Sequence, residues 1–244
     1  MNIIKIGGSA LNPDGKYDLK LVAELVEIVQ KNKEKFLFVI GGGKICRFCQ
    51  QACSSFFKKA LIDQKAVDLA NDEIGIAITK INANYVLKQF QEQLGEEVCA
   101  QIILDPTHKI KSDCRIFFAG GWKPGHSTDK DLMLLAETFK AEKVFKITNF
   151  AYVKDVPAIE IDKLSDAQRS KRLSSAKSIP KMSWTDLQKI VGKEWHAGMN
   201  TPFDPQAAEI GFRLRKELQL YFLRKEELAK AIEEKKFNGT IVKG

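Results

Sequence analysis

The sequence lacks any long uninterrupted run of apolar residues, and this absence bears first on membranes. Its longest apolar stretches, such as Phe36–Ile40, have the length of a single strand and fall far short of the roughly 20 residues that span a bilayer. The beginning of the chain also lacks the apolar core and small-residue cleavage site of a secretory signal. We therefore expect a cytoplasmic protein with no membrane partner.

Cysteine and histidine are scarce, with five and three residues respectively. An odd number of cysteines without an export signal argues against a disulfide framework. Cys46 and Cys49 have the Cys-x-x-Cys spacing, but a zinc site needs a second pair of ligands, and His108, His126 and His196 are isolated from one another. We expect no metal held by the protein alone.

Two common phosphate-binding patterns are missing as well. The chain has no G-x-x-x-x-G-K-[ST] segment and no G-x-G-x-x-G segment. These segments are the signatures of P-loop ATPases and of dinucleotide-binding dehydrogenases. Both of these classes are therefore disfavoured.

Composition and charge indicate an ordinary globular protein. Of the 244 residues, 44% are hydrophobic and 29% are charged, and the formal net charge is +8, a balance typical of a folded domain. A basic excess can bind nucleic acid, but here short basic patches such as Lys235–Lys236 are interleaved with acidic residues. We expect a solvated surface rather than a nucleic-acid partner.

Apolar runs of strand length alternate with segments of helical period, the first of which covers residues 21–29. The expected buried strands are Asn2–Ile6, Phe36–Ile40, Arg115–Ala119, Val144–Thr148 and Leu218–Leu223. This alternation predicts an α/β fold with a mostly parallel central sheet, helices on both faces and ligands at the carboxyl ends of the strands.

The helix expected after Phe36–Ile40 carries three of the cysteines. With about 100° of rotation per residue, Cys46, Cys49 and Cys53 fall beside one apolar arc. That arc consists of Ile45, Phe48, Ala52 and Phe56. We expect the thiols at the edge of the core, and Arg47 on the opposite side, facing a ligand.

A second segment is expected to be irregular. Ser165–Ser183 is rich in Ser, Lys and Arg, a composition that favours a mobile loop or lid.

Glycine clusters follow the first two expected strands, as Gly7-Gly8-Ser9 and Gly41-Gly42-Gly43-Lys44. Glycine lets backbone N–H groups approach an anion, and a following helix N-terminus adds free donors. Either cluster alone is ordinary turn chemistry, but their repetition indicates two phosphate contacts.

Three further segments also lie at strand ends or helix starts. Ala119–Asp129 precedes an apolar helix over Leu132–Ala136, and Thr148-Asn149 ends a strand. Gly198–Ala208 opens a helix with Asp204 as N-cap before a proline. These positions place polar side chains where a ligand would bind.

In this order, the segments resemble those of the amino acid kinase family, and within it the uridylate kinases of archaeal type. The matching motifs are Lys5-x-Gly7-Gly8-Ser9, Gly41-Gly42-Gly43-Lys44-x-x-Arg47, Asp72-x-x-Gly75-Ile76-x-x-Thr79-x-x-Asn82-Ala83, Gly125-x-Ser127-Thr128-Asp129, Thr148-Asn149, Asp204-Pro205-x-Ala207-Ala208 and Phe237-Asn238-Gly239-Thr240. Together they cover nearly the whole chain.

The resemblance implies a three-layer α/β/α sandwich of the amino acid kinase (carbamate kinase-like) type, with all 244 residues in one domain. Its N-terminal lobe, about residues 1–140, would hold UMP, and its C-terminal lobe, about residues 141–244, would hold ATP. It also implies a homohexamer. Asp204 stands in a region where relatives that act on amino acids carry lysine, which favours UMP as the acceptor.

The implied reaction transfers a phosphoryl group from ATP to UMP, giving UDP in pyrimidine nucleotide synthesis, with Mg²⁺ carried by ATP and no protein ligand to it. Lys5 would contact the moving phosphoryl group, while Asp129 and Asp204 fix Lys5 and the loop geometry. The residues implied on the ATP side are Gly8, Ser9, Gly43, Arg47, Thr148, Asn149 and Asp155. Those implied on the UMP side are Gly42, Asp72, Trp122, Lys123, Pro124, Gly125, His126, Ser127 and Thr128.

The loop after Thr148-Asn149, where the resemblance places the adenine of ATP, departs from the family pattern. Ala151 stands in place of an expected Asp, and Lys154 in place of an expected Tyr. Two alternatives therefore stay open. One is a kinase of the same fold for another small phosphate or carboxylate, and the other is a non-catalytic nucleotide sensor or nucleic-acid-binding regulator. Retention of Lys5, Asp129 and both glycine clusters favours catalysis.

Overall fold

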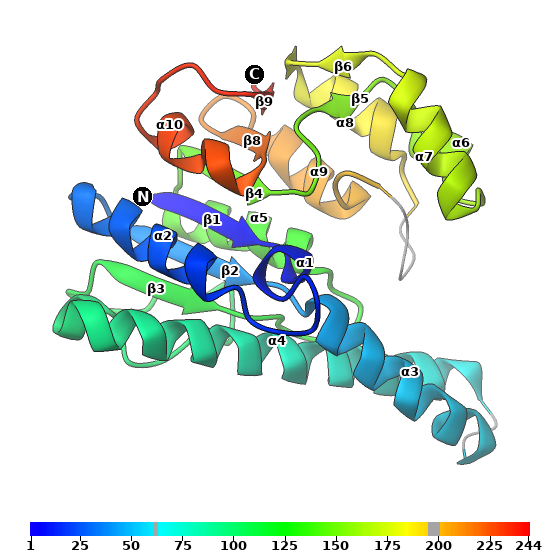
Figure 1. Cartoon of the computed structure of the whole chain (residues 1–244), viewed down its shortest axis with the longest axis horizontal. Helices are drawn as coiled ribbons and strands as arrows, with labels where there is room; N and C mark the ends of the chain where they lie inside the picture. The colour runs from blue at the N-terminus through cyan, green and yellow to red at the C-terminus, as the bar shows by residue number, and fades with distance from the viewer. Residues whose placement is uncertain (61–62, 195–200) are drawn as a thin grey trace.

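A computed structural model describes residues 1–60, 63–194 and 201–244 of the chain. Within these ranges, seven strands form one sheet in the order β3-β2-β1-β4-β8-β9-β7 (Figure 1). Its strands are β1 (Asn2–Ile6), β2 (Phe36–Ile40), β3 (Ile116–Ala119), β4 (Lys143–Ile147), β7 (Lys181–Met182), β8 (Gln219–Leu223) and β9 (Gly239–Val242). The strands from β3 to β8 in this order are parallel, and only the β8–β9 pair is antiparallel. A separate antiparallel pair joins β5 (Val153–Lys154) to β6 (Ser178–Ile179).

The central strands are continuous apolar runs because helices bury both faces of the sheet. Side chains alternate between the two faces, so Ile3 belongs to one core and Ile4 to the other. The core of Ile3 includes side chains of α5 (Thr128–Phe139), α8 (Trp184–Val191) and α9 (Pro205–Arg213). The core of Ile4 includes side chains of α2 (Leu19–Lys31), α4 (Gln64–Leu94) and α10 (Leu228–Ile232). This three-layer arrangement confirms the predicted fold class.

The expected strands agree with the structure to within one residue at each end. The helical period over residues 21–29 is also confirmed. Asp18 caps the start of α2 by accepting the Leu21 N–H at 3.0 Å, and the apolar side chains of this helix face the core. The predicted helix over Leu132–Ala136 lies inside α5, which begins four residues earlier.

The prediction of a mobile loop over Ser165–Ser183 was wrong. Most of this segment is helix α7 (Asp166–Ser175), followed by β6 and β7. Ser165 and Ser183 each form a capping box, at the starts of α7 and α8 respectively. The serines at both ends of the segment therefore begin helices, and no side chain of α7 is buried, which explains its polar composition.

The expectation for α3 (Gly43–Ala60) was also wrong in part. The cysteines are half-buried as expected, but Phe48 and Phe56 are 72% and 67% exposed. Gln50 instead faces α4, where its side chain donates to the Asn71 carbonyl. The reason is that α3 and the start of α4 project beyond the sheet (Figure 1), so there is no core beneath the apolar arc.

No helix in the described ranges is long and apolar enough to cross a membrane.

The packing of α8 on α9 depends on a glycine. A Cβ atom on Gly211 would lie 2.0 Å from the ring of Trp184, which is only 1% exposed. We predict that Gly211→Ala lowers the free energy of unfolding by about 2 kcal/mol, because overpacking a rigid core forces side chains out of their rotamers. Urea denaturation measures the change. In a Trp184→Leu background the same alanine should cost little, and an equal cost in both backgrounds would contradict this explanation.

Candidate functional site

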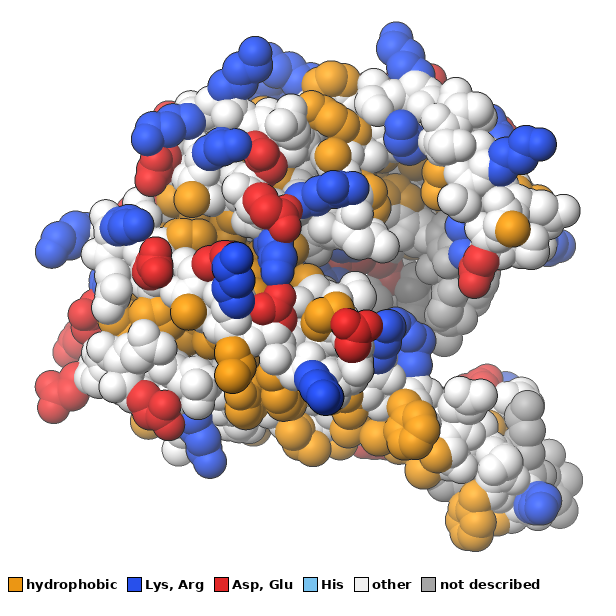
Figure 2. Space-filling view, viewed as in Figure 1, with side chains coloured by type: hydrophobic (Ala, Val, Ile, Leu, Met, Phe, Trp, Pro, Cys, Tyr) orange, Lys and Arg blue, Asp and Glu red, His pale blue; other side chains and the backbone are white. Residues whose placement is uncertain are grey.

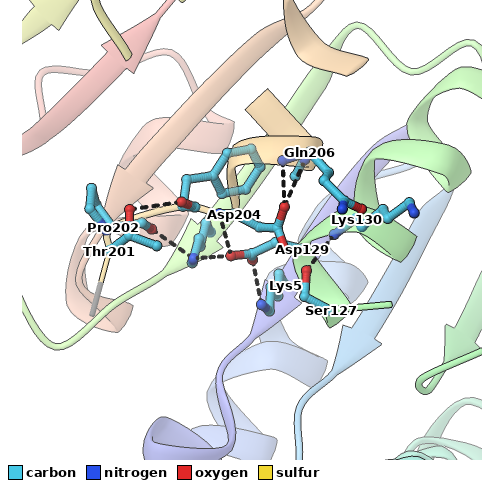
Figure 3. Close-up of polar contacts among 11 residues, drawn as sticks. Lys5, Ser127, Asp129, Lys130, Thr201, Pro202, Asp204 and Gln206 are labelled. Atoms are coloured by element: carbon cyan, nitrogen blue, oxygen red, sulfur yellow. Dashed lines mark hydrogen bonds and ion pairs between the residues drawn. The ribbon is translucent and has the colours of Figure 1, made fainter. Parts of the chain in front are cut away.

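Two lysines on neighbouring strands share one carboxylate at the carboxyl edge of the sheet. Lys5 in β1 lies directly opposite Lys146 in β4. The Lys5 ammonium contacts Asp129 Oδ1, and the Lys146 ammonium donates to Asp129 Oδ2 at 2.7 Å. Figure 3 shows Lys5 and Asp129 pointing toward one another, with Asp204 next to the carboxylate. The structure thus brings Lys5, Asp129 and Asp204 together, as predicted.

Local sequence explains why these groups meet. Lys5 lies two residues beyond Ile3, and Lys146 two beyond Val144, so both lysines point to the sheet face that α5 and α9 cover. Asp129 lies in the first turn of α5, which Ser127 caps by accepting the Lys130 N–H at 3.1 Å. A helix N-terminus favours a carboxylate, so the start of α5 is a suitable place for the negative charge.

The charges in this cluster strongly perturb one another. Burial would raise the pKa of Asp129, but the ammonium groups of Lys146 and Lys5 outweigh it and lower this pKa to about 2. Burial lowers the pKa of Lys146 to about 8, against the pull of the Asp129 carboxylate. Asp129 is therefore ionised at neutral pH, and Lys146 is mostly protonated there.

Asp204 reaches the cluster through its backbone. Its N–H donates to Asp129 Oδ2 at 3.3 Å, while its Oδ1 accepts the N–H groups of Gln206 and Ala207 at the start of α9. Pro205 occupies the first turn, so the predicted N-cap is confirmed. The second oxygen, Oδ2, is buried without a hydrogen-bond partner in the described protein.

The two glycine clusters pack backbone against backbone. A Cβ atom on Gly8 would lie 1.9 Å from the Gly43 nitrogen, and Gly43 itself has φ = 69°. Asn12 completes the contact, because its Oδ1 accepts the Lys44 N–H at 3.1 Å. Only glycines allow this approach, so the loops after β1 and β2 form one continuous backbone surface.

Helix α4 holds the loops after β2 and β3 through three polar side chains. Asn82 donates to the carbonyls of Gly41 at 2.9 Å and Gly42 at 3.2 Å. Thr79 accepts the N–H of Gly121 at 2.7 Å, and Asp72 accepts that of Gly125 at 2.8 Å. The motif from Asp72 to Asn82 therefore has a structural explanation.

The loop after β3 is built around a buried acid. Asp131, which is 1% exposed, accepts the Trp122 N–H at 3.0 Å and lies 3.0 Å from His126 Nδ1. Burial raises the pKa of Asp131, against the bonds from Trp122 and His126. The Lys123 ammonium lies 3.8 Å from the centre of the Trp122 ring. Pro124 and the positive φ of Gly125 complete the turn, and Thr128 is the first residue of α5.

A cavity of about 280 Å³ opens beside the first glycine cluster. Its lining includes Ser9, Thr148, Asn149, Arg224 and Lys225, so residues expected on the ATP side meet there. The Thr148 hydroxyl already bonds within the protein, donating to the Phe150 carbonyl at 2.6 Å.

Four residues expected on the ATP side, Gly8, Gly43, Arg47 and Asp155, do not line this cavity. Asp155 is exposed, and its backbone N–H donates to the Lys177 carbonyl. Arg47 is exposed in the second turn of α3. Neither is among the residues that line the cavity.

The described residues form no protein cage for a metal, since they contain no group of three or more His, Cys, Asp or Glu side chains suited to one. Both oxygens of Asp129 are taken by lysines. His196 and the segment Gly198–Asn200 lie outside the described residues.

Sequence reasoning missed Lys146 and Asp131. The available signal was a charged side chain at a buried position: Lys146 interrupts an apolar strand, and Asp131 lies on the inner side of an apolar helix. Such residues are rarely buried without a partner.

The chain has two glycine loops in contact and two lysines that share one carboxylate, at the carboxyl edge of a parallel sheet. These features define a class of α/β proteins suited to holding phosphate-bearing ligands. More specifically, the chain belongs to the amino acid kinase family, whose family model matches residues 1–217.

The chain is similar to several named proteins. It is 31% identical to the uridylate kinase of Pyrococcus abyssi over 231 residues, which cover 92% of this chain and 90% of that protein. It is 27% identical to the uridylate kinase of Thermococcus kodakarensis over an alignment of 248 positions, which covers 98% of each chain. Among solved structures, the uridylate kinase from Archaeoglobus fulgidus has a TM-score of 0.73 at 23% identity, covering 99% of both chains. The UMP kinase from Bacillus anthracis has a TM-score of 0.68 at 20% identity, covering 99% of this chain and 95% of that one. Both of these solved structures have the same fold as this chain.

The contact between the glycine loops can be tested with neighbouring glycines. We predict that Gly8→Ala lowers the free energy of unfolding by about 3 kcal/mol, because the new Cβ would meet backbone that cannot rotate away. Gly7→Ala is the matched control, since its Cβ would meet nothing closer than 3.6 Å. Urea denaturation compares the two variants. Equal stability of the two would show that the loops are not in close contact.

Proposed function

We propose that the protein is a nucleoside monophosphate kinase that transfers the γ-phosphoryl group of ATP to UMP, giving UDP. The observation that carries the proposal is the Lys5–Asp129–Lys146 cluster, in which Lys5 lies two residues before the first glycine cluster and Asp129 lies in the first turn of α5. The similarity to uridylate kinases along almost the whole chain supports UMP as the acceptor.

The chemistry suits these residues, because phosphoryl transfer asks a protein mainly to position two anions and neutralise charge. An oxygen of the UMP phosphate attacks the γ-phosphorus, and the bond from that phosphorus to the β–γ bridging oxygen breaks. Lys5 stabilises the charge on the moving group, with N–H donors from Gly8 and Ser9. Asp129 holds Lys5 directly, and Asp204 holds Asp129 through its N–H.

The two substrates would occupy opposite sides of Lys5. On the ATP side we place Gly8, Ser9, Gly43, Thr148 and Asn149. Arg47 and Asp155 do not line the cavity beside Ser9, and the family resemblance alone assigns them to this side. On the UMP side we place Gly42, Asp72 and the loop from Trp122 to Thr128. Mg²⁺ would arrive with ATP and supply further charge neutralisation when bound, and we assign it no protein ligand.

We also propose that the enzyme acts in the cytoplasm, in pyrimidine nucleotide synthesis, as a homohexamer. Support for an assembly comes from the exposed apolar side chains of α3 and α4, namely Phe48, Phe56, Leu69 and Ile81. Figure 2 shows hydrophobic side chains gathered along the edge of the molecule that these two helices form. Large apolar areas of this kind are typical of protein interfaces.

The role of Lys5 can be measured directly. We predict that Lys5→Ala lowers kcat by about 100-fold or more with a modest change in KM, because the lost contact stabilises the transition state. A coupled assay of ATP, Mg²⁺ and a panel of phosphate acceptors measures both constants. Turnover of UMP by this variant at the wild-type rate would remove Lys5 from the reaction. A preference of the wild type for another acceptor would overturn the choice of UMP.

Asp72 gives a second test, on the acceptor side. It accepts the Gly125 N–H in the structure, so its removal should loosen the acceptor loop as well as any contact with the UMP sugar. We predict that Asp72→Ala weakens UMP binding by about tenfold, the loss of one charge-assisted hydrogen bond, with little change in ATP binding. Calorimetry measures both affinities, and Asp68→Ala, an exposed change one turn earlier on α4, is the control. Unchanged UMP affinity would exclude Asp72 from the site.

A further inference from the structure

Lys146 occupies an unusual position for a lysine. It lies inside a strand of the central sheet with only 14% of its side chain exposed. Its ammonium donates to Asp129 Oδ2 and to the Pro202 carbonyl, both at 2.7 Å. The rings of Phe203 and Phe222 lie 5.1 and 5.9 Å from this ammonium. Keeping a charge in such a place is costly unless it is paired, and the roles assigned above to Lys5, Asp129 and Asp204 do not explain it.

The pairing leaves an unbalanced charge. Lys5 and Lys146 are two cations on one carboxylate, so the three groups together carry one net positive charge. Asp204 is the other charged group that acts on Lys146. Its Oδ1 accepts two N–H groups that begin α9, and the positive end of that helix offsets part of its charge, while its Oδ2 makes no hydrogen bond in the described protein. If Lys5 alone faced Asp129, the two charges would cancel, and little positive charge would remain to attract a phosphate.

We propose that Lys146 is a positioning residue for phosphoryl transfer, which takes one oxygen of Asp129 and thereby leaves the charge of Lys5 available to the moving phosphoryl group. This inference rests on the proposed function. Lys146 acts through Asp129 and needs no contact with a substrate. Its second bond, to the Pro202 carbonyl, also ties the segment before α9 to the same carboxylate. The Asp129 carboxylate is therefore held by groups from β1, β4 and the segment before α9.

The proposal makes the reaction sensitive to the protonation of Lys146. Its burial, which Lys5 reinforces and Asp129 and Asp204 oppose, lowers its pKa to about 8. Above that pH the amine becomes neutral, and Asp129 then cancels the charge of Lys5. We predict that kcat/KM of the wild type falls as pH rises through about 8, since this ratio reports groups of the free enzyme.

The decisive variants are Lys146→Met, which keeps the length and packing of the side chain without its charge, and Lys146→Arg, which stays protonated at every accessible pH. At pH 7 we expect Lys146→Met to lower kcat on the order of 10-fold to 100-fold, with KM for UMP within about threefold. Lys146→Arg should retain most of kcat, and its kcat/KM should no longer fall near pH 8. Lys143→Met, in the same strand but paired with Glu234 outside the site, is the control.

Either of two kinetic results would overturn the proposal. One is a Lys146→Met variant with wild-type kcat and an unchanged pH profile. The other is a Lys146→Arg variant that folds and still loses activity near pH 8. Circular dichroism and thermal unfolding of each variant separate lost activity from lost structure, and if Lys146→Met does not fold, Lys146→Arg decides the question.

A readout without substrate keeps this inference separate from the proposed function. NMR of ¹³C-labelled lysine follows the ε-carbon signals of the nucleotide-free protein, and the Lys146 signal is the one absent from Lys146→Arg. We expect that signal to titrate near pH 8, whereas titration near 10.4, the ordinary value for lysine, would overturn the predicted fall in kcat/KM above pH 8. If the wild type phosphorylated no acceptor, the proposed function would fail, and the role of Lys146 in that reaction would fail with it. If it phosphorylated an acceptor other than UMP, the same variants would test Lys146 with that acceptor.

Discussion

The Asp129 carboxylate is the group on which the rest of the site depends. It joins Lys5 from β1, Lys146 from β4 and the N–H of Asp204 before α9, three elements that are remote in sequence. Without it, two ammonium groups on adjacent strands would face each other in a poorly hydrated place, where a buried unpaired charge is strongly destabilising. The order of the strands and the starts of two helices are therefore tied to a single negative charge.

The sequence was most informative where the structural signal is local. A glycine cluster after an apolar run, or an Asp before a proline, needs only a few neighbouring residues to be recognised, and Gly8, Gly43 and Asp204 were found in this way. The roles assigned to them came from the family resemblance and not from geometry. Lys146 escaped notice because its importance comes from lying opposite Lys5, a register that no local pattern specifies.

The two wrong expectations have a common cause. Periodicity identified which residues of α3 share a face, but whether that face is covered depends on where the helix lies relative to the sheet, and the apolar arc of α3 extends past it. Likewise, the composition of Ser165–Ser183 suggested a loop because serine is common in loops, whereas both terminal serines cap helices. In each case a property of single residues was used to judge a property of their surroundings.

Helix α4 has a mechanical consequence. Its side chains at positions 72, 79 and 82 hold the backbone of the loops that follow β2 and β3, and these attachment points span about 15 Å of one rigid helix. The distance between the two loops is thus set by the helical rise, so neither loop can shift alone without breaking a bond to α4. The start of α4 projects beyond the sheet together with α3 (Figure 1). A force applied to this projecting part along the axis of α4 would move both loops in the same direction.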